Sequence, residues 1–258
     1  MGKRVIGAIA LPRNLKEAEV EAARAAHDAG GQFRNFYVKS VLRSVSDGQP
    51  HSTIGGHLKN GPFEAAGVDE FKFLLELGLT RNSVCIDYGC GTLRIGQHVM
   101  QFVAPGNYWG LDIDEELLKL GEGLVGNALI SERRPNLLCI SDTSIANAAK
   151  ANPDFVFSWK VLQHVHPDEL HDHLRAFCLL IGRNTNAFIC RTKWHESRTL
   201  RYKLKGWAHS LTTVRSITDD LGIQVEVVTC RHKYLSDEGS DGAKAGTLRL
   251  KRSTPRIS

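Results

Sequence analysis

Short apolar runs alternate with helical patterns of apolar residues from about residue 81 onward. The runs indicate buried strands because they are nearly continuously apolar, as in Phe155-Val156-Phe157. Strands are expected at 83–87, 108–112, 136–140, 154–159, 187–191, 223–230 and 246–250. Helices are expected at 93–102, 115–124, 144–150, 168–181 and 207–221. This order predicts an α/β fold with a doubly wound, mostly parallel, seven-stranded sheet that helices cover on both faces.

The last two expected strands have no helix between them. Residues 231–245 join them and include the polar, glycine-bearing run 236–242. Such a run is typical of an exposed turn, so we expect the two strands to pair in antiparallel fashion.

The first 80 residues follow a helical pattern instead. The expected elements there are helices at 15–29, 33–45 and 63–77 and a polar loop at 46–61. Glycines close the first and last of these helices, at Gly30 and Gly78. We therefore expect two parts, a helical N-terminal extension at 1–80 that caps the ligand site and a larger α/β domain at 81–258.

Composition and charge narrow the class of protein. Lys and Arg number 33 against 28 Asp and Glu, and the net charge is +5. This mildly basic balance suits an acidic ligand without demanding nucleic acid, and the composition excludes a disordered or fibrous chain. No apolar run approaches the roughly 20 residues of a membrane span, so no membrane partner is expected. The six cysteines show no zinc or dithiol spacing, which predicts buried thiols in a cytoplasmic protein.

The sharpest chemical signal is an apolar strand that runs into Asp87-Tyr88-Gly89-Cys90-Gly91 before a helix. Glycine lets a ligand approach the backbone closely, and a helix start offers free N–H groups. Asp112 ends the next expected strand, 23 residues after Gly89, where an acid can accept hydrogen bonds from two ribose hydroxyls. These features predict a nucleoside at the carboxyl ends of the first strands.

Two other interpretations of the glycine turn stay open. It can be a tight strand–helix connection without a ligand. It can also belong to a fold that binds a nicotinamide or flavin dinucleotide, but Arg94 stands where that fingerprint has its third glycine, and Gly96 comes two residues late. Asp87 would repel a pyrophosphate and attract an ammonium group. The residues by themselves favour a nucleoside that carries a cationic group.

At these residues the chain resembles the class I S-adenosylmethionine-dependent methyltransferases, over about residues 62–251. Their first motif is an apolar strand, an acid and Gly-x-Gly, and the likeness extends to the runs 139–142 and 154–165 and to the antiparallel last strand. It implies S-adenosylmethionine as cofactor and 81–258 as the domain that binds it. The cofactor-binding residues that it implies are Asp87, Gly89, Cys90, Gly91, Asp112, Ile113, Asp142 and Trp159.

Within that set, the resemblance assigns Asp112 to the ribose, Asp142 to the adenine amine, and Asp87 with the two glycines to the methionine part. A looser likeness points to a bacterial subgroup often found near glycan biosynthesis; it lies at 54–56, 63–79, 91–96 and 105–110. We therefore expect methyl transfer to oxygen or nitrogen of a small molecule or a glycan (saccharide) precursor. The alternatives are a methyltransferase of RNA or protein, a nucleotide-dependent oxidoreductase and a non-catalytic relative. A nucleic-acid partner is not favoured.

Two histidines follow the fourth expected strand, in the region that faces the methyl group in this fold. His164 and His166 are the candidate catalytic residues, each as a base or as a group that orients the acceptor. His164 can instead be a hydrogen-bonded residue at a helix start, and His166 can simply precede the helix that Pro167 begins. Lys160 can reach an anionic acceptor or remain solvated.

Two more groups of residues have competing interpretations. A histidine-rich run at 164–173 suggests a metal, but His171 and His173 lie two apart on a helix and face different sides, so no metal site is expected. Residues 191–205 carry six basic residues and one acid, with aromatic residues interleaved. That segment can be a lid for a phosphate or acidic sugar, a nucleic-acid contact or a solvated connector.

Overall fold

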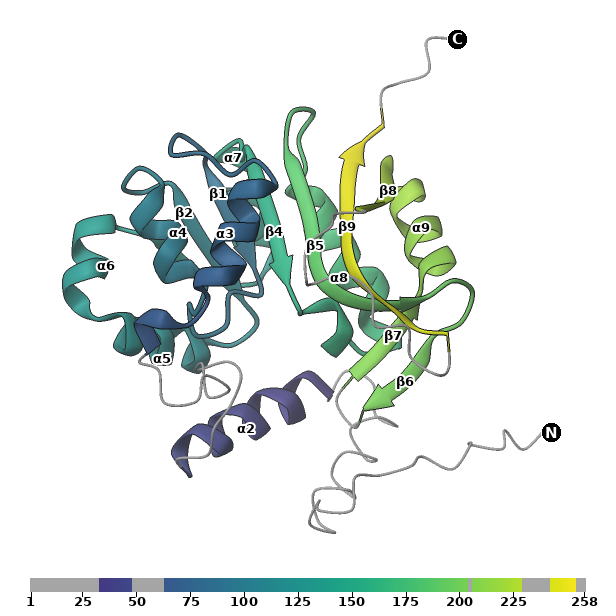
Figure 1. Cartoon of the computed structure of the whole chain (residues 1–258), viewed down its shortest axis with the longest axis horizontal. Helices are drawn as coiled ribbons and strands as arrows, with labels where there is room; N and C mark the ends of the chain where they lie inside the picture. Colours follow the sequence, from purple (N-terminus) through teal and green to yellow (C-terminus); the bar gives the residue numbers. More distant parts are fainter. Residues whose placement is uncertain (1–32, 48–62, 204–205, 229–241, 254–258) are drawn as a thin grey trace.

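The computed structural model describes residues 33–47, 63–203, 206–228 and 242–253. One sheet runs through the molecule (Figure 1). Within these ranges it has nine strands, which are β1 Cys85–Tyr88, β2 Tyr108–Asp112, β3 Asn136–Cys139, β4 Phe155–Trp159, β5 Asn186–His195, β6 Leu200–Lys203, β7 Gly206–Ser210, β8 Ile223–Val228 and β9 Lys244–Arg252. The order β3-β2-β1-β4-β5 is parallel throughout. β9 lies antiparallel between β5 and β8, and a β6–β7 hairpin continues from the end of β5.

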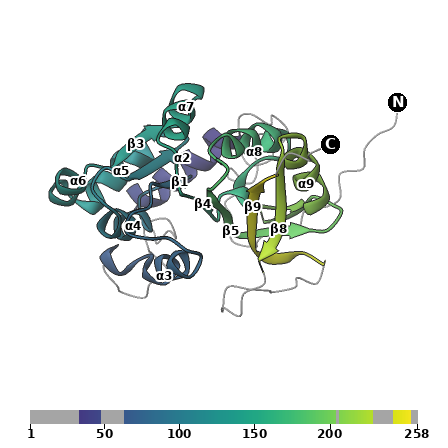
Figure 2. The ribbon, with the colours of Figure 1, turned by 90° about the horizontal axis from the view of Figure 1, so that it is seen from above.

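Helices cover both faces of this sheet. The α-helices are α2 Phe33–Ser46, α3 Val68–Glu76, α4 Gly96–Phe102, α5 Glu115–Val125, α6 Asn127–Arg133, α7 Asp142–Lys150, α8 Leu170–Leu179 and α9 Leu211–Asp220, and the short 3-10 helices are η3 Phe63–Ala65, η4 Leu162–His164 and η5 Pro167–Glu169. One apolar cluster joins the sheet to α7, α8 and α9, and another joins it to α3, α4 and α5. Figure 2 shows α3 and α4 on the opposite side of the strands from α8 and α9. The doubly wound α/β fold is thereby confirmed.

All seven expected strands are present, and the last two pair in antiparallel fashion as predicted. β6 and β7 are additional, and the predicted helix over 207–221 was wrong in its first residues. Trp207, Leu211 and Val214 have helical spacing, but β7 pairs its His209 with Trp194 of β5. The helix starts only after Ser210, whose side chain accepts the Thr213 N–H. Pairing with a buried strand has overridden the local pattern.

Two helix boundaries that involve glycines also differ from the expectation. The helix over 63–77 is interrupted at Gly67, where φ is +88° and a Cβ would lie 2.4 Å from the Arg94 carbonyl oxygen. The helix expected from Leu93 starts at Gly96, because Leu93 itself has φ +61°. Gly96 lets α4 approach β2 closely, since a Cβ there would lie 2.2 Å from the Tyr108 hydroxyl. Helix α6 was not predicted.

α2 matches the amphipathic stretch expected at 33–45 and crosses beneath the carboxyl ends of the parallel strands (Figure 1). Val41 is buried against Leu117 of α5, while Phe36 and Tyr37 pack on Trp207 of β7. α2 therefore contacts both helix α5 and strand β7. The expected helix at 15–29 and nearly all of the loop at 46–61 lie outside the described residues.

Two further expectations concern the cysteines and the membrane. Cys85, Cys90, Cys178 and Cys190 are buried as predicted, whereas Cys139 is exposed at the end of β3, so the prediction was wrong there. The sixth cysteine lies outside the described residues. Within the described part of the chain, no helix has the length and apolar character needed to cross a membrane.

Candidate functional site

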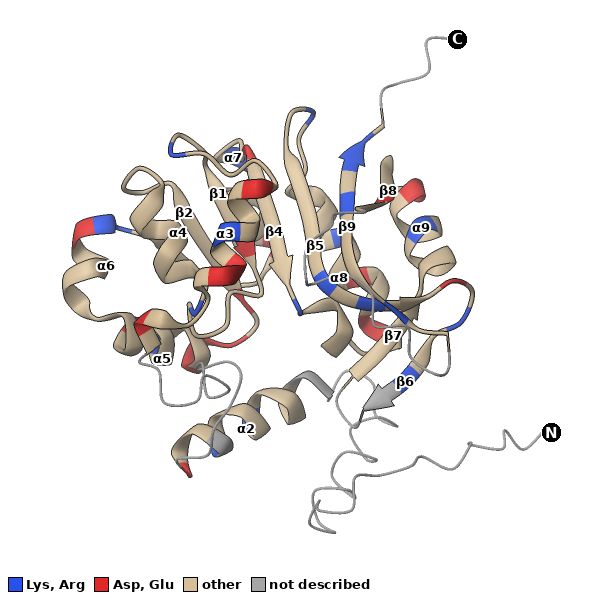
Figure 3. Cartoon of the chain, viewed as in Figure 1, with Lys and Arg blue, Asp and Glu red and all other residues tan. Residues whose placement is uncertain are grey.

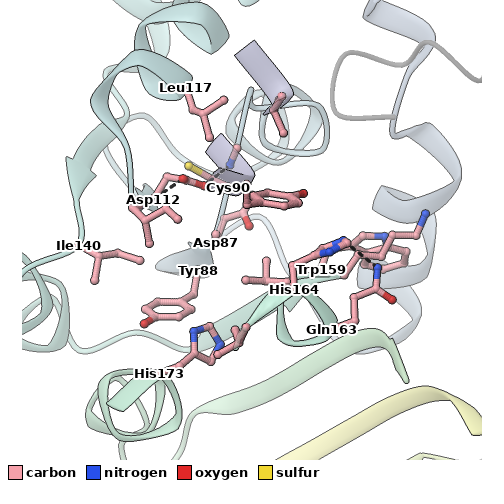
Figure 4. Close-up of a pocket in the computed structure, with 18 of the residues that line it drawn as sticks. Asp87, Tyr88, Cys90, Asp112, Leu117, Ile140, Trp159, Gln163, His164 and His173 are labelled. Carbon is pink, nitrogen blue, oxygen red and sulfur yellow. Dashed lines mark hydrogen bonds between the residues drawn. The ribbon is translucent and has the colours of Figure 1, made fainter. Parts of the chain in front are cut away.

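A cavity of about 860 Å³ lies at the carboxyl ends of β1, β2, β4 and β5. It brings together most of the residues predicted from the sequence, which are Asp87, Gly89, Cys90, Gly91, Asp112, Ile113, Trp159 and His164. Two predicted residues, Asp142 and His166, are not part of its lining. Figure 4 shows Asp112 and Ile140 on one side of the cavity and Trp159 and His164 on the other.

The Gly89–Gly91 turn has no room for a side chain at its first glycine. Gly89 has φ +84°, and a Cβ there would lie 2.4 Å from a Val161 methyl carbon. Its N–H and that of Cys90 donate to the Leu111 carbonyl, at 2.7 and 3.1 Å. We expected free N–H groups at a helix start, but the Gly89 and Cys90 N–H groups donate to the Leu111 carbonyl, and α4 begins five residues after Gly91. The turn admits a ligand by lacking side chains.

Asp112 is the acid that the turn holds in place. One carboxylate oxygen accepts the Gly91 N–H at 2.6 Å and the other accepts the Ile113 N–H at 2.8 Å. The side chain is 5% exposed, and burial raises its pKa to about 6 although the N–H donors oppose the shift. The carboxylate is thus fixed at the end of β2 before any ligand arrives.

Asp87 is a second buried acid, at the end of β1. The Tyr108 hydroxyl donates to it at 3.0 Å. Burial nevertheless raises its pKa to about 7, and the nearby Asp112 adds to the shift while Arg94 opposes it. Arg94 itself pairs with Glu70 of α3 at 2.8 Å. An acid at this pKa changes charge near neutral pH, which is typical of a functional site.

Apolar side chains line the cavity on the β2–β3 side. This surface is formed by Ile113, Leu117 and Ile140. Ile113 is 40% exposed, so an apolar group of a ligand can contact it. Asp142 lies just beyond it as the first residue of α7, exposed to solvent. Its neighbour Ser141 forms a capping box with Ser144, so the start of this helix is fixed locally.

The opposite side of the cavity carries the histidine region. His164 stacks on Tyr37 of α2 with ring centroids 4.8 Å apart, and its Nε2 lies 3.1 Å from the Gln163 side-chain nitrogen. His209 holds the backbone around His164 in place, because its Nε2 lies within hydrogen-bond distance of the Leu162 and Val165 carbonyls, at 3.0 and 3.1 Å. His164 therefore lines the cavity from a backbone segment that these hydrogen bonds fix.

His166 has a different place. It is buried, its Nδ1 accepts the Asp168 N–H at 3.2 Å, and its ring meets Trp207 edge-on. It is the residue that caps η5, with Pro167 as the first residue of that helix. His166 thus directly precedes this short helix, as one of its two interpretations expected, and a catalytic role for it stays a prediction.

Several residues that line the cavity were not predicted from the sequence. Tyr37 comes from α2, 50 residues before Asp87, and no local signal points to it. His173 of α8 also lines the cavity while His171 is exposed, so the two do face different sides as predicted. Burial lowers the pKa of His173 to about 3, and its Nε2 has no hydrogen-bond partner. Among the described residues, no three potential metal ligands gather in one place.

Neither family models nor the curated proteins give a match to this sequence. Solved structures do. The magnesium protoporphyrin IX methyltransferase ChlM from Synechocystis PCC 6803, with bound S-adenosylhomocysteine, matches with a TM-score of 0.54 at 17% identity, over 88% of this chain and 99% of that one. The chain has the fold of the S-adenosylmethionine-dependent methyltransferases.

A second structure with this methyltransferase fold comes from Burkholderia thailandensis. It is the 1,6-didemethyltoxoflavin-N1-methyltransferase, with bound 1,6-didemethyltoxoflavin and S-adenosylhomocysteine. Its TM-score is 0.51 at 14% identity, over 95% of this chain and 94% of that one. At such identities the likeness concerns the fold, and the chemistry of the site has to be argued from the residues of this chain.

Proposed function

We propose that the protein is an S-adenosylmethionine-dependent methyltransferase that acts on a small molecule. The observation that carries the proposal is the Gly89–Gly91 turn, which meets two buried carboxylates, Asp87 and Asp112, on the wall of one large cavity. The two structural neighbours with bound S-adenosylhomocysteine support it at the level of the fold.

The residues present fit the cofactor. A cavity of about 860 Å³ is within the range of roughly 300–1,000 Å³ that ligand sites have. Asp87 would hold the ammonium of the methionine part beside the Gly89–Gly91 turn, and Asp112 would accept the ribose hydroxyls. Ile113 and Ile140 would contact the adenine ring, with Cys90, Trp159 and the exposed Asp142 as further proposed contacts.

When bound, the cofactor supplies a methyl group already activated on a sulfonium, so the protein mainly orients the acceptor and excludes water. Trp159 and the stacked pair of Tyr37 and His164 wall the part of the cavity left for the acceptor. An alcohol or ammonium acceptor must lose a proton, and we propose His164 as the group that takes it or orients the acceptor. His166 is the second candidate for this role, but its ring lies outside the cavity lining, so we expect His164 and not His166 to act.

The acceptor class is proposed from the shape of the site. The cavity is lined on several sides by α2, η4 and α8, which suits a small molecule, including a glycan precursor methylated at oxygen or nitrogen. A protein or RNA acceptor would have to present its target group to the same pocket.

Thermal unfolding with S-adenosylmethionine, S-adenosylhomocysteine and NAD tests the proposal directly. Only a ligand of the folded state raises the melting temperature, and the first two compounds are expected to do so. Stabilisation by NAD alone would contradict the proposal and favour an oxidoreductase. Incubation with a labelled methyl donor and a cell extract then separates acceptors, because label in small molecules is expected, whereas label in protein or ribonuclease-sensitive label indicates the alternatives.

A further inference from the structure

Three cations line the cavity from two neighbouring strand ends, and we call them the strand-end cations: Lys160, Arg191 and Lys193. Lys160 directly follows β4, and its N–H donates to the Cys190 carbonyl of β5 at 2.9 Å. Lys193 is the register partner of Ala245 in β9, another residue of the cavity lining. Figure 3 shows basic segments on this part of β5 and on β6.

Two of the three strand-end cations have an unusual backbone conformation. Lys160 has φ +59° and Arg191 has φ +49°, and only five non-glycine residues have positive φ in the described ranges. The register of β5 against β9 shifts between Ile189 and Thr192, which is a bulge at Arg191. Ile189 and Trp194 consequently share one core cluster, although Trp194 is the fifth residue after Ile189 and would point to the opposite face in a regular strand.

Such conformations are unfavourable for a residue with a side chain and persist where the surrounding structure enforces them. A bulge redirects the side chains that follow it, and bulges are frequent beside ligand sites. Lys160 and Arg191 both have left-handed φ, and the Lys160 N–H donates to Cys190, the residue just before Arg191, so the two cations are held close together in the fold. The observation is independent of the Gly89–Gly91 turn.

Carboxylates also line the cavity, and their places matter. Asp87 and Asp112 belong to the ends of β1 and β2, while Glu169 and Asp172 come from η5 and α8. A fourth cation of the lining, Arg94, pairs with Glu70 outside it. Lys160 follows Trp159 at the end of β4, and Arg191 and Lys193 belong to β5. The proposed ribose acid, Asp112, ends β2, which β1 separates from β4 in the sheet.

We propose that the methyl acceptor carries an anionic group, a carboxylate or a phosphate, that binds the strand-end cations while its apolar or aromatic part lies against Trp159 and Val161. This inference rests on the proposed function, whose cofactor would occupy the β1–β2 side of the same cavity. Arginine and lysine together suit such oxyanions, because they offer several N–H donors and full charge.

The test uses simple probes on the full chain, with and without saturating S-adenosylhomocysteine. Phenyl phosphate and benzoate are the two anionic probes, and phenol and benzamide are their neutral counterparts. Dissociation constants from ligand-observed NMR titrations are expected to be at least about tenfold lower for one or both anions than for the neutral probes. The two anions distinguish a phosphate from a carboxylate site.

The variants are chosen so that the backbone stays as it is. Arg191→Asn removes the charge with a residue that tolerates left-handed φ, and Lys193→Gln keeps the length of the side chain. The double variant is expected to bind the preferred anion at least about tenfold more weakly, with unchanged S-adenosylhomocysteine affinity. Lys251→Gln, on the solvent-exposed side of β9, is the control and should bind both probes as the wild type does.

Equal binding of anionic and neutral probes overturns the proposal, and so does a double variant that retains anion affinity, which would mean adventitious ion binding only. Failure of the wild type to bind S-adenosylhomocysteine would instead contradict the proposed function. In that case the titrations without S-adenosylhomocysteine still decide whether the strand-end cations select an anion.

Discussion

Gly89 and Gly106 form a natural pair for separating backbone strain from steric exclusion. Their φ values are +84° and +85°, but a Cβ at Gly89 would meet Val161 at 2.4 Å whereas Gly106 has nothing within 4 Å. Alanine at either position pays for left-handed φ, about 1 kcal/mol. Only Gly89→Ala must also displace Val161 and distort the turn.

We therefore expect Gly106→Ala to lower the melting temperature slightly and to bind S-adenosylhomocysteine normally. Gly89→Ala should weaken that binding by at least about tenfold, because the turn is where the ligand approaches the backbone. Calorimetry on both variants measures this. Equal affinities in the two variants would show that the Gly89–Gly91 turn does not touch the ligand.

Asp87 makes a second residue-scale prediction, about pH. Its pKa is raised to about 7 by burial, so the ligand-free site is largely protonated below neutral pH. A ligand ammonium favours the ionised form, so binding should release a proton there. The affinity for S-adenosylhomocysteine is expected to rise roughly tenfold between about pH 5.5 and pH 7.5. Asp87→Asn should bind more weakly and with a flatter pH profile; an unchanged profile would place the ammonium elsewhere.

His164 and His166 differ only by two positions in the sequence but lie in different surroundings. His164→Ala should lower turnover at least about tenfold with little change in S-adenosylhomocysteine affinity, because the ring faces the proposed acceptor side. His166→Asn keeps an acceptor for the Asp168 N–H and is expected to leave turnover near the wild-type value. Collapse of cofactor affinity in His164→Ala would assign that residue to the cofactor instead.

At the scale of elements, α2 connects the two sides of the cavity. Its Val41 packs on Leu117 of α5, while Tyr37 stacks on His164 and also lines the cavity. α2 packs on the outside of the molecule and pairs with no strand, so it is expected to open more easily than the buried sheet. A bound ligand that touches Tyr37 and Leu117 would hold it closed.

Hydrogen exchange measures this coupling. S-adenosylhomocysteine is expected to slow amide exchange in α2 of the wild type, and Val41→Ala should raise exchange in α2 without raising it in β1 or β4. The expected cost of that substitution is about 1–2 kcal/mol, since one buried side chain is shortened. Equal exchange in α2 with and without the ligand would disconnect this helix from the site.

At the scale of the whole molecule, two pairs of buried groups respond to pH in opposite directions. Asp87 and Asp112 have pKa values raised to about 7 and about 6, so their contribution to stability is present below about pH 4 and lost as the pH rises through those values. His173 and His209 have pKa values lowered to about 3 and about 4, so theirs is present above about pH 6.5 and lost on acidification.

Asp87→Asn should therefore stabilise the ligand-free protein near pH 8, by about 2–5 °C in melting temperature, and have little effect near pH 4. The remaining histidines should then make the variant lose stability more steeply on acidification than the wild type does. A melting-temperature series over this pH range checks both statements. Destabilisation at pH 8 would mean that the ionised carboxylate is satisfied in the fold.

Much of the fold follows from local pattern. The apolar runs and the helical spacings between them are properties of consecutive residues, so β1 to β5, β8 and β9 and the helices on both faces could be predicted from them. The motif around Gly89 could be predicted for the same reason, because a strand, an acid and two glycines are adjacent in the chain. Asp112 followed from its place at the end of the next strand.

The tertiary structure alone decided what depends on distant partners. β7 is a strand because β5 offers a free edge to His209, although its own residues have helical spacing. Tyr37 reaches the cavity because α2 packs across two elements, and Arg191 lines it from a bulge in the pairing of β5 with β9. The spacing of apolar residues in the sequence therefore determined the strands, most of the helices and the glycine turn. Long-range pairing and burial determined which side chains surround the part of the cavity proposed for the acceptor.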